Sequence, residues 1–126
     1  MKKPPQIIGL HHIALNVYNL EICKRFYTEL LHFKVEWQPD ENNLYLTSGA
    51  DNLALHRVKE PVSQGVLDHF GLVVNDIDDV DLWHEFLSQN KVVIEKPPRT
   101  HRDGARSFYC RDPENNLIQV IYHLYH

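Results

Sequence analysis

One passage of this chain occurs twice. Residues 10–20 read LHHIALNVYNL and residues 67–77 read LDHFGLVVNDI, with Leu, His, Leu and Val at matched positions. A self-similarity of this kind predicts a domain built from two copies of one supersecondary unit. It also puts a histidine at the same place in each copy, His12 and His69. A pseudo-symmetric fold can bring two such imidazoles together at its centre.

The same order of elements is expected in both copies. In the first copy the residue patterns predict a strand over 8–17, a helix from the capping residue Asn19 to about 32, and strands at about 34–38, 43–48 and 52–58. A polar linker covers 59–65. In the second copy they predict a strand over 66–74, a helix capped by Asp76 or Asp78 and ending near Asn90, a strand over 92–95 broken by Pro97 and Pro98, and a hairpin of 105–110 with 117–123. The chain is therefore expected to be one α+β domain of 126 residues with two βαβββ modules, about 8–58 and 66–123.

Composition excludes several classes of partner. A formal net charge of -4 and a pI near 6.1 give no reason to expect nucleic acid. No apolar run is long enough to suggest a membrane span. The two cysteines, Cys23 and Cys110, do not make a disulfide framework, so a reducing compartment and a cytoplasmic location are expected.

Strand alternation predicts where the two histidines point. In the first strand the bulky apolar residues Leu15 and Val17 share one face and His12 lies on the other. Since the amphipathic helix covers the apolar face, His12 and, by the same pattern, His69 should face away from the helices. In the final strand Gln119 alternates with Ile118 in the same way and is a third candidate for that open face.

Three motifs together resemble the vicinal oxygen chelate superfamily, which includes glyoxalase I, extradiol dioxygenases, fosfomycin-resistance enzymes and metal-free bleomycin-binding proteins. They are the doubled L-x-H-(I/F)-(A/G)-L-x-V unit, the two βαβββ modules and the ending FYCRDPENNLIQ over 108–119. The resemblance implies a cupped mixed sheet formed by both modules, with the helices outside. It covers nearly the whole chain but does not select one reaction, because this scaffold hosts many chemistries.

The resemblance also implies a metal site. Carried over position by position, its ligands are His12, His69 and Gln119, and the equivalent place in the first module is Ala54, which cannot ligate. The ion would be divalent, with Mn, Fe, Zn and Ni all possible. The superfamily pattern D-P-x-G-x-x-(I/L)-E ends in glutamate, whereas this chain has Gln119. Replacing a carboxylate with a neutral amide should lower the affinity for the ion and leave a bound ion a stronger Lewis acid.

Substrate contacts are expected around a basic turn. Arg99, His101, Arg102 and Arg106 flank Asp103-Gly104 and suggest an anionic substrate, although a solvated loop would show the same residues. By resemblance to the fosfomycin enzymes, Arg99, Ser107 and Tyr109 lie in plausible substrate-binding places, and Tyr109 is also a candidate catalytic residue. A tyrosine packed in the sheet is the alternative. His56 shares a face with Ala54 and is a second catalytic candidate, as a substrate contact or substitute ligand, or else a partly exposed strand residue.

Two functions are compatible with these residues. The first is a divalent-metal-dependent enzyme of lyase, isomerase, transferase or dioxygenase type that acts on a small, anionic, oxygen-bearing molecule. The alternative is a metal-free protein of the bleomycin-resistance type that binds and sequesters a small molecule. Neither needs nucleic acid or a membrane. The resemblance implies a homodimer, and the sequence leaves open whether the His12 and His69 of one site come from the same chain.

Overall fold

The repeated order of elements is present in the structure, a computed structural model that describes residues 4, 9–62, 65 and 67–124. The predicted strand starts at residues 8 and 66, and linker residues 63–64, lie outside the described residues. The elements are β1 (His12–Val17), α1 (Leu20–Arg25), the π-helical turn η1 (Phe26–Leu30), β2 (Lys34–Asp40), β3 (Asn43–Thr47), β4 (Asn52–Arg57), β5 (Phe70–Val73), α2 (Ile77–Gln89), β6 (Ile94–Thr100), β7 (Arg106–Arg111) and β8 (Leu117–Tyr122).

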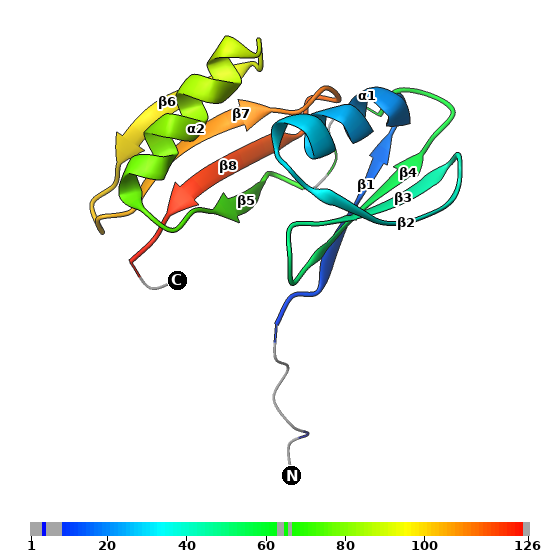
Figure 1. Cartoon of the computed structure of the whole chain (residues 1–126), viewed down its shortest axis with the longest axis horizontal. Helices are drawn as coiled ribbons and strands as arrows, with labels where there is room; N and C mark the ends of the chain where they lie inside the picture. Colours follow the sequence, from blue (N-terminus) through cyan, green and yellow to red (C-terminus); the bar gives the residue numbers. More distant parts are fainter. Residues whose placement is uncertain (1–3, 5–8, 63–64, 66, 125–126) are drawn as a thin grey trace.

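The two modules have the same topology. One sheet has the strand order β1-β4-β3-β2 and the other β5-β8-β7-β6, and in each the first and last strands of the module pair in parallel. The sheets lie side by side, and α1 and α2 run along their upper side (Figure 1). This confirms the predicted α+β fold of two βαβββ modules with the helices outside.

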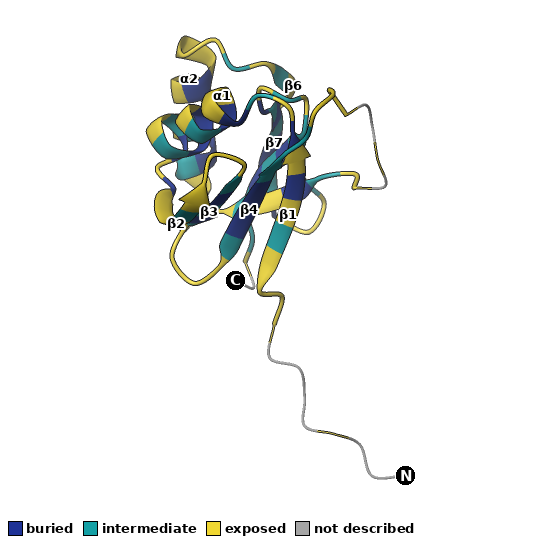
Figure 2. Cartoon of the chain, turned by 90° about the vertical axis from the view of Figure 1, so that its right-hand side faces the viewer, coloured by how far each residue is buried: buried dark blue, intermediate teal, exposed yellow. Residues whose placement is uncertain are grey.

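Strand alternation separates a buried face from an open one, as predicted. Leu15 and Val17 of β1 are buried, whereas His12, Ala14 and Asn16 are exposed. In β8, Ile118 and Val120 are buried and Gln119 between them is only partly so. Buried and exposed residues alternate along β1 in Figure 2. The core therefore lies between the sheets and the helices, and the histidine-bearing face is left open.

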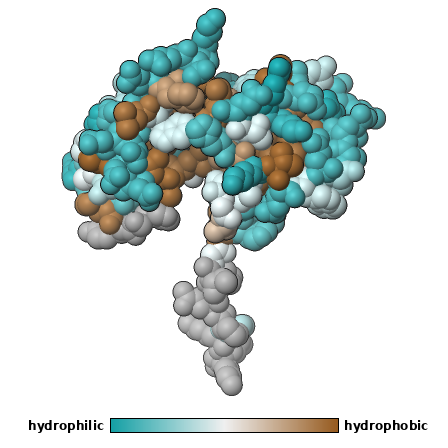
Figure 3. All heavy atoms as spheres, viewed as in Figure 1, coloured by the Kyte–Doolittle hydropathy of each residue, from teal (hydrophilic) through white to brown (hydrophobic). Residues whose placement is uncertain are grey.

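Hydrophilic residues cover much of the outer surface, and hydrophobic residues show between the helices and the sheets (Figure 3). Within the described part of the chain, neither helix is long and apolar enough to cross a membrane.

Helix ends follow the capping residues predicted from the sequence. The Asn19 side chain accepts a hydrogen bond from the Ile22 amide at 3.1 Å, and α1 then widens into the π-helical turn. Asp76 and Asp79 form a capping box at the start of α2, and Asn90 is its C-cap. Each cap satisfies backbone groups that a helix end leaves without an intrahelical partner.

The predicted break at Pro97 and Pro98 is wrong. Both residues lie inside β6, which continues to Thr100. Because β6 is the edge strand of its sheet, it can hold prolines at positions that need no ladder hydrogen bond. The pairing with β7 shifts register on either side of Lys96, which accommodates the two rings.

A buried polar bridge joins the two modules. The Tyr27 hydroxyl in η1 donates to the Asp112 carboxylate at 2.6 Å. Burial first, and then the neighbouring Asp112 charge, raise the pKa of Tyr27 well above its usual range. The Glu114 carboxylate accepts from the amides of Tyr18 and Asn19 at 2.7 and 3.0 Å. The loop between β7 and β8 therefore holds the start of α1 and η1 in place.

Candidate functional site

His69 presents one ring nitrogen to the open face. Its Nδ1 lies 2.7 Å from the Asp68 carboxylate, which can only accept, so Nδ1 carries the hydrogen and donates. The lone pair of the neutral ring then resides on Nε2. A carboxylate that orients a histidine in this way is a common outer partner in metal sites.

In the first module the residue before His12 also contacts its Nδ1, but that residue is another histidine. The His12 Nδ1 lies 3.0 Å from the Nδ1 of His11, and the two rings meet edge to face at 5.2 Å. In both copies of the repeat, therefore, the residue immediately before the candidate ligand engages its Nδ1 nitrogen. This leaves Nε2 of His12, like that of His69, directed away from the bonded neighbour.

Gln119 lies between two strands that carry other candidate residues. Its partners across the sheet are Gly71 of β5 and Tyr109 of β7. The Tyr109 ring packs edge to face against His69 at 5.4 Å, and Gln119 donates through Nε2 to the Ser107 hydroxyl at 3.1 Å. The open face of the second sheet thus brings together His69, Gln119, Tyr109 and Ser107.

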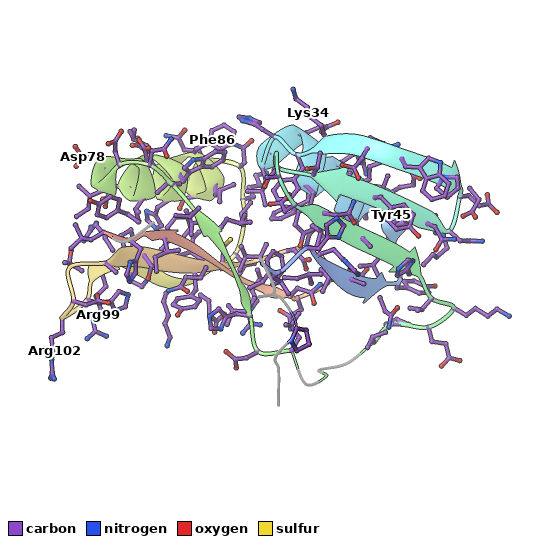
Figure 4. The ribbon with its side chains drawn as sticks, turned by 90° about the horizontal axis from the view of Figure 1, so that it is seen from below. Lys34, Tyr45, Asp78, Phe86, Arg99 and Arg102 are labelled. Atoms are coloured by element: carbon purple, nitrogen blue, oxygen red, sulfur yellow. The ribbon has the colours of Figure 1, made fainter. Side chains whose placement is uncertain are left out.

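His12 and His56 belong to the first sheet. There β1 and β4 pair Asn16 with His56, whose Nδ1 lies 2.7 Å from the Asn43 amide oxygen. Tyr45 meets His56 edge to face and stacks on Trp37 at 5.3 Å. Figure 4 shows Tyr45 and the Arg99–Arg102 end of the second module on opposite sides of the molecule. Across the described residues, no three His, Cys, Asp or Glu side chains gather where they could share an ion.

The basic turn divides between two faces. Arg99, His101 and Arg102 line an open hollow together with Gln119. Arg106 instead makes paired bonds of 2.8 Å to Asp81 of α2 and a third bond to Thr100. This corrects the expectation that Arg106 contacts substrate: as the strand neighbour of Ser107 it points toward the helix. The Arg106 guanidinium holds the pKa of Asp81 below its usual value.

Two further sequence positions can now be placed. Ala54 is buried opposite Ala14, at the register position expected for a fourth ligand. Ser107 is only 2% exposed, and its hydroxyl contacts His101 Nε2 at 2.8 Å as well as Gln119. The sequence did not identify His11, Asp68 and His101 as residues that hydrogen-bond a candidate ligand or its neighbour. For the first two, adjacency to the repeated histidine was the available signal.

Neither cysteine is suited to nucleophilic chemistry. Cys23 and Cys110 are both free and buried. Burial, followed by the nearby Asp112 charge, raises the pKa of each thiol to about 12. Since the thiolate is the reactive form, both cysteines are inert core residues at neutral pH.

Comparison with known proteins identifies the family of this chain. The profile of the Glyoxalase/Bleomycin resistance protein/Dioxygenase superfamily matches residues 9–120. The chain belongs to this superfamily. It is 26% identical over 118 residues to the metallothiol transferase FosB of Staphylococcus epidermidis, covering 91% of this chain and 82% of that protein. It is 30% identical over 122 residues to virulence protein STM3117 of Salmonella typhimurium, covering 88% and 81%. The crystal structure of the fosfomycin resistance protein FosX from Listeria monocytogenes superposes with a TM-score of 0.78 at 19% identity, covering 94% and 95%, and shares the fold.

The loop before β8 contains one departure from the superfamily pattern. In the superfamily pattern D-P-x-G, the glycine place is taken by Asn115, whose φ is 69°. This left-handed conformation favours glycine, and asparagine is one of the few other residues that adopt it readily. Asn115 can therefore take the backbone conformation for which the pattern uses glycine.

Proposed function

We propose that this protein is a divalent-metal-dependent enzyme of the superfamily, with Nε2 of His12, Nε2 of His69 and Oε1 of Gln119 as its metal ligands. The observation that carries the proposal is the matched bonding of the two histidines. Asp68 accepts the Nδ1 hydrogen of His69, which leaves a lone pair on Nε2, and His12 offers its Nε2 in the same way when its Nδ1 donates to His11.

The donor set suits a divalent ion. Neutral imidazoles suit Fe, Zn and Ni, and an amide oxygen suits harder ions such as Mn, so the mixed set is acceptable to all four. Three protein ligands leave positions open for a substrate. A bound ion would supply Lewis-acid stabilisation to negative charge on substrate oxygens. The relatives support this reading, since one is named a metallothiol transferase.

We propose further that a homodimer completes the site. His12 begins β1 of the first sheet, whereas His69 precedes β5 and Gln119 lies in β8 of the second sheet, and His12 is exposed in the single chain. A second copy that lays its first sheet over this second sheet would bring the two half-sites together. The same contact would cover Trp37, which is 60% exposed on the first sheet.

The substrate is proposed to be a small anion with adjacent oxygens. Arg99 and Arg102 line the hollow beside Gln119 and would attract negative charge. Tyr109 lies next to both His69 and Gln119, with Lys96 Nζ 5.6 Å from its ring centre, and its hydroxyl is the candidate catalytic donor. His56 would join from the first sheet of the other copy. Among reaction classes, similarity to a metallothiol transferase favours group transfer. The cytoplasmic location stays a prediction.

A titration with metal ions tests this function against the metal-free alternative, which the neutral Gln119 favours. Chelator-stripped protein is titrated with Mn²⁺, Zn²⁺ and Ni²⁺ by calorimetry, and its oligomeric state is measured by light scattering. We expect one ion per chain for at least one metal, in a dimer. Substoichiometric, weak binding of all three ions would contradict the enzyme assignment and leave a binding protein as the better account.

A further inference from the structure

The amide of Gln119 raises a question of orientation. Only the amide oxygen has a lone pair to offer a cation, and a half-turn about the last side-chain bond exchanges oxygen and nitrogen in almost the same space. A glutamate at this position would have no such ambiguity, because its two oxygens are equivalent. A glutamine ligand therefore needs neighbours that distinguish its two ends.

The structure fixes which end faces which neighbour. Gln119 Nε2 donates to the Ser107 hydroxyl at 3.1 Å. The oxygen Oε1 lies on the β5 side, 4.0 Å from the point where a Cβ on Gly71 would stand. Gly71 is the partner of Gln119 across the sheet and lies two residues after His69. The ligating oxygen thus faces the strand that follows the candidate ligand His69.

Ser107 alone cannot select this orientation. A hydroxyl accepts and donates equally well, so it would hold the flipped amide by donating to Oε1. The Nε2 of His101 lies 2.8 Å from the same hydroxyl, and it removes that option when it accepts the Ser107 hydrogen, which requires the His101 ring hydrogen to be on Nδ1. With the Ser107 hydrogen donated to His101, the hydroxyl can only accept from Gln119. Ser107 is 2% exposed, which leaves little access for a water molecule to replace either bond.

A tight turn holds the His101 ring in reach. The His101 amide donates to the Ala105 carbonyl at 2.6 Å, and the Gly104 amide donates to the His101 carbonyl at 3.0 Å. Gly104 has a φ of 89°, which favours glycine, and Asp103 accepts from the Ala105 amide. His101 is therefore positioned by the backbone between β6 and β7.

We infer that His101 and Ser107 are positioning residues that turn the Gln119 carboxamide so that its oxygen faces the metal site. The inference rests on the proposed function, in which Gln119 is a ligand. The inference assigns His101 the tautomer with its hydrogen on Nδ1, so that Gln119 Nε2–H donates to Ser107 and the Ser107 O–H donates to His101 Nε2. His101 and Ser107 thus orient the Gln119 amide. A glutamate at this position would need no such help, because its two oxygens are equivalent.

Manganese affinity in four variants tests the inference. Full-length Ser107→Ala and His101→Ala proteins should each bind Mn²⁺ about 10–100-fold more weakly than wild type, the range typical of outer partners of metal ligands. Ser107→Thr keeps the hydroxyl and should restore binding. The double variant should be no weaker than Ser107→Ala alone, because the two residues act in series. Circular dichroism confirms that each variant folds.

The decisive comparison repeats Ser107→Ala and His101→Ala in a Gln119→Glu background. Because the two oxygens of a carboxylate are equivalent, each substitution should change the Mn²⁺ affinity by no more than about threefold in this background. Undiminished effects in this background would assign the pair a merely structural role and overturn the inference. Wild-type affinity in both single variants would overturn it as well.

A metal-free measurement separates this inference from the proposed function. The Gln119 side-chain NH₂ resonances, identified by their loss in Gln119→Glu, should exchange slowly with solvent in wild type and rapidly in Ser107→Ala. Fast exchange in wild type would contradict the inference whatever the metal does. Slow exchange in a wild-type protein that does not bind Mn²⁺ would show that the Gln119 amide is oriented. It would also refute the metal-dependent function, and with it a positioning role toward a metal.

Discussion

Replacing either His69 or His12 with alanine is expected to weaken divalent-metal binding by more than about 100-fold. Loss of a residue that only hydrogen-bonds a metal ligand costs about 10–100-fold, and loss of the ligand itself should cost more. Each substitution removes a direct ligand from a site that has only three. Because both histidines are proposed as direct ligands of one ion, their effects should be similar, although His12 begins β1 and His69 precedes β5. Calorimetric titration and elemental analysis of the purified variants measure the loss.

His84→Ala is the matched control for these two variants. His84 is a partly buried histidine of α2, and its ring packs edge to face on Phe108 at 5.4 Å on the helix side of the sheet. Its removal should leave metal affinity within about threefold of wild type, since it touches no proposed ligand. Equal losses in all three variants would indicate general destabilisation in place of a ligand role for His12 and His69.

The Asp112→Ala variant should show the largest loss of folding stability, about 3–5 kcal/mol of unfolding free energy. The Asp112 side chain is almost fully buried and accepts from the Tyr27 hydroxyl, from the amides of Glu114 and Asn116, and from the Asn116 side chain. Alanine would leave these donors without their acceptor inside the protein. Because Tyr27 belongs to the first module, the loss should also loosen the contact between modules.

Urea denaturation followed by fluorescence measures this loss, with Asp40→Ala as its control. Asp40 makes the same kind of turn, accepting from the Asn42 amide at 2.8 Å and from the Asn43 side chain, but it is exposed. Water can replace those bonds, so the control should cost about 1 kcal/mol or less. A similar loss in both variants would show that the buried bridge to Tyr27 adds little.

The fold could be predicted to a large extent because it follows from the local periodicity of apolar and polar residues. Alternation along β1 and β8 assigned Leu15, Val17 and Ile118 to the buried face and His12 and Gln119 to the open face, and the structure agrees. Asn19 was predictable as a helix cap because the capping bond to Ile22 joins residues three apart. Signals of this range depend on the residue and its near neighbours alone.

Other features depend on contacts between distant segments and could not be predicted in this way. The bond from Tyr27 to Asp112 joins residues 85 apart in the sequence. In the sequence Arg106 looks like the neighbouring Arg99 and Arg102. Its place in the alternation of β7 and its bond to the Asp81 carboxylate direct it to the helix side. Pro97 and Pro98 read as a break because the sequence does not reveal that β6 is an edge strand.

The three proposed ligands come from the sequence: matched repeats suggested His12 and His69, and the family resemblance suggested Gln119. Their role as ligands stays a prediction, and the sequence left open how they would be brought together. In the structure His12 belongs to the first module, and His69 and Gln119 belong to the second. The link from Gln119 through Ser107 to His101 spans the β7–β8 pair and a turn, so no short motif reveals it.

A mixed dimer of one His12→Ala chain and one His69→Ala chain tests most directly whether two copies build each metal site from His12 of one and His69 of the other. In such a dimer one site lacks both histidines and the second site keeps both. Two different affinity tags allow the mixed dimer to be purified, and elemental analysis then counts its manganese. We predict one ion per mixed dimer and none in either parent dimer. No metal in the mixed dimer, alongside a fully loaded wild-type protein, would contradict the shared site.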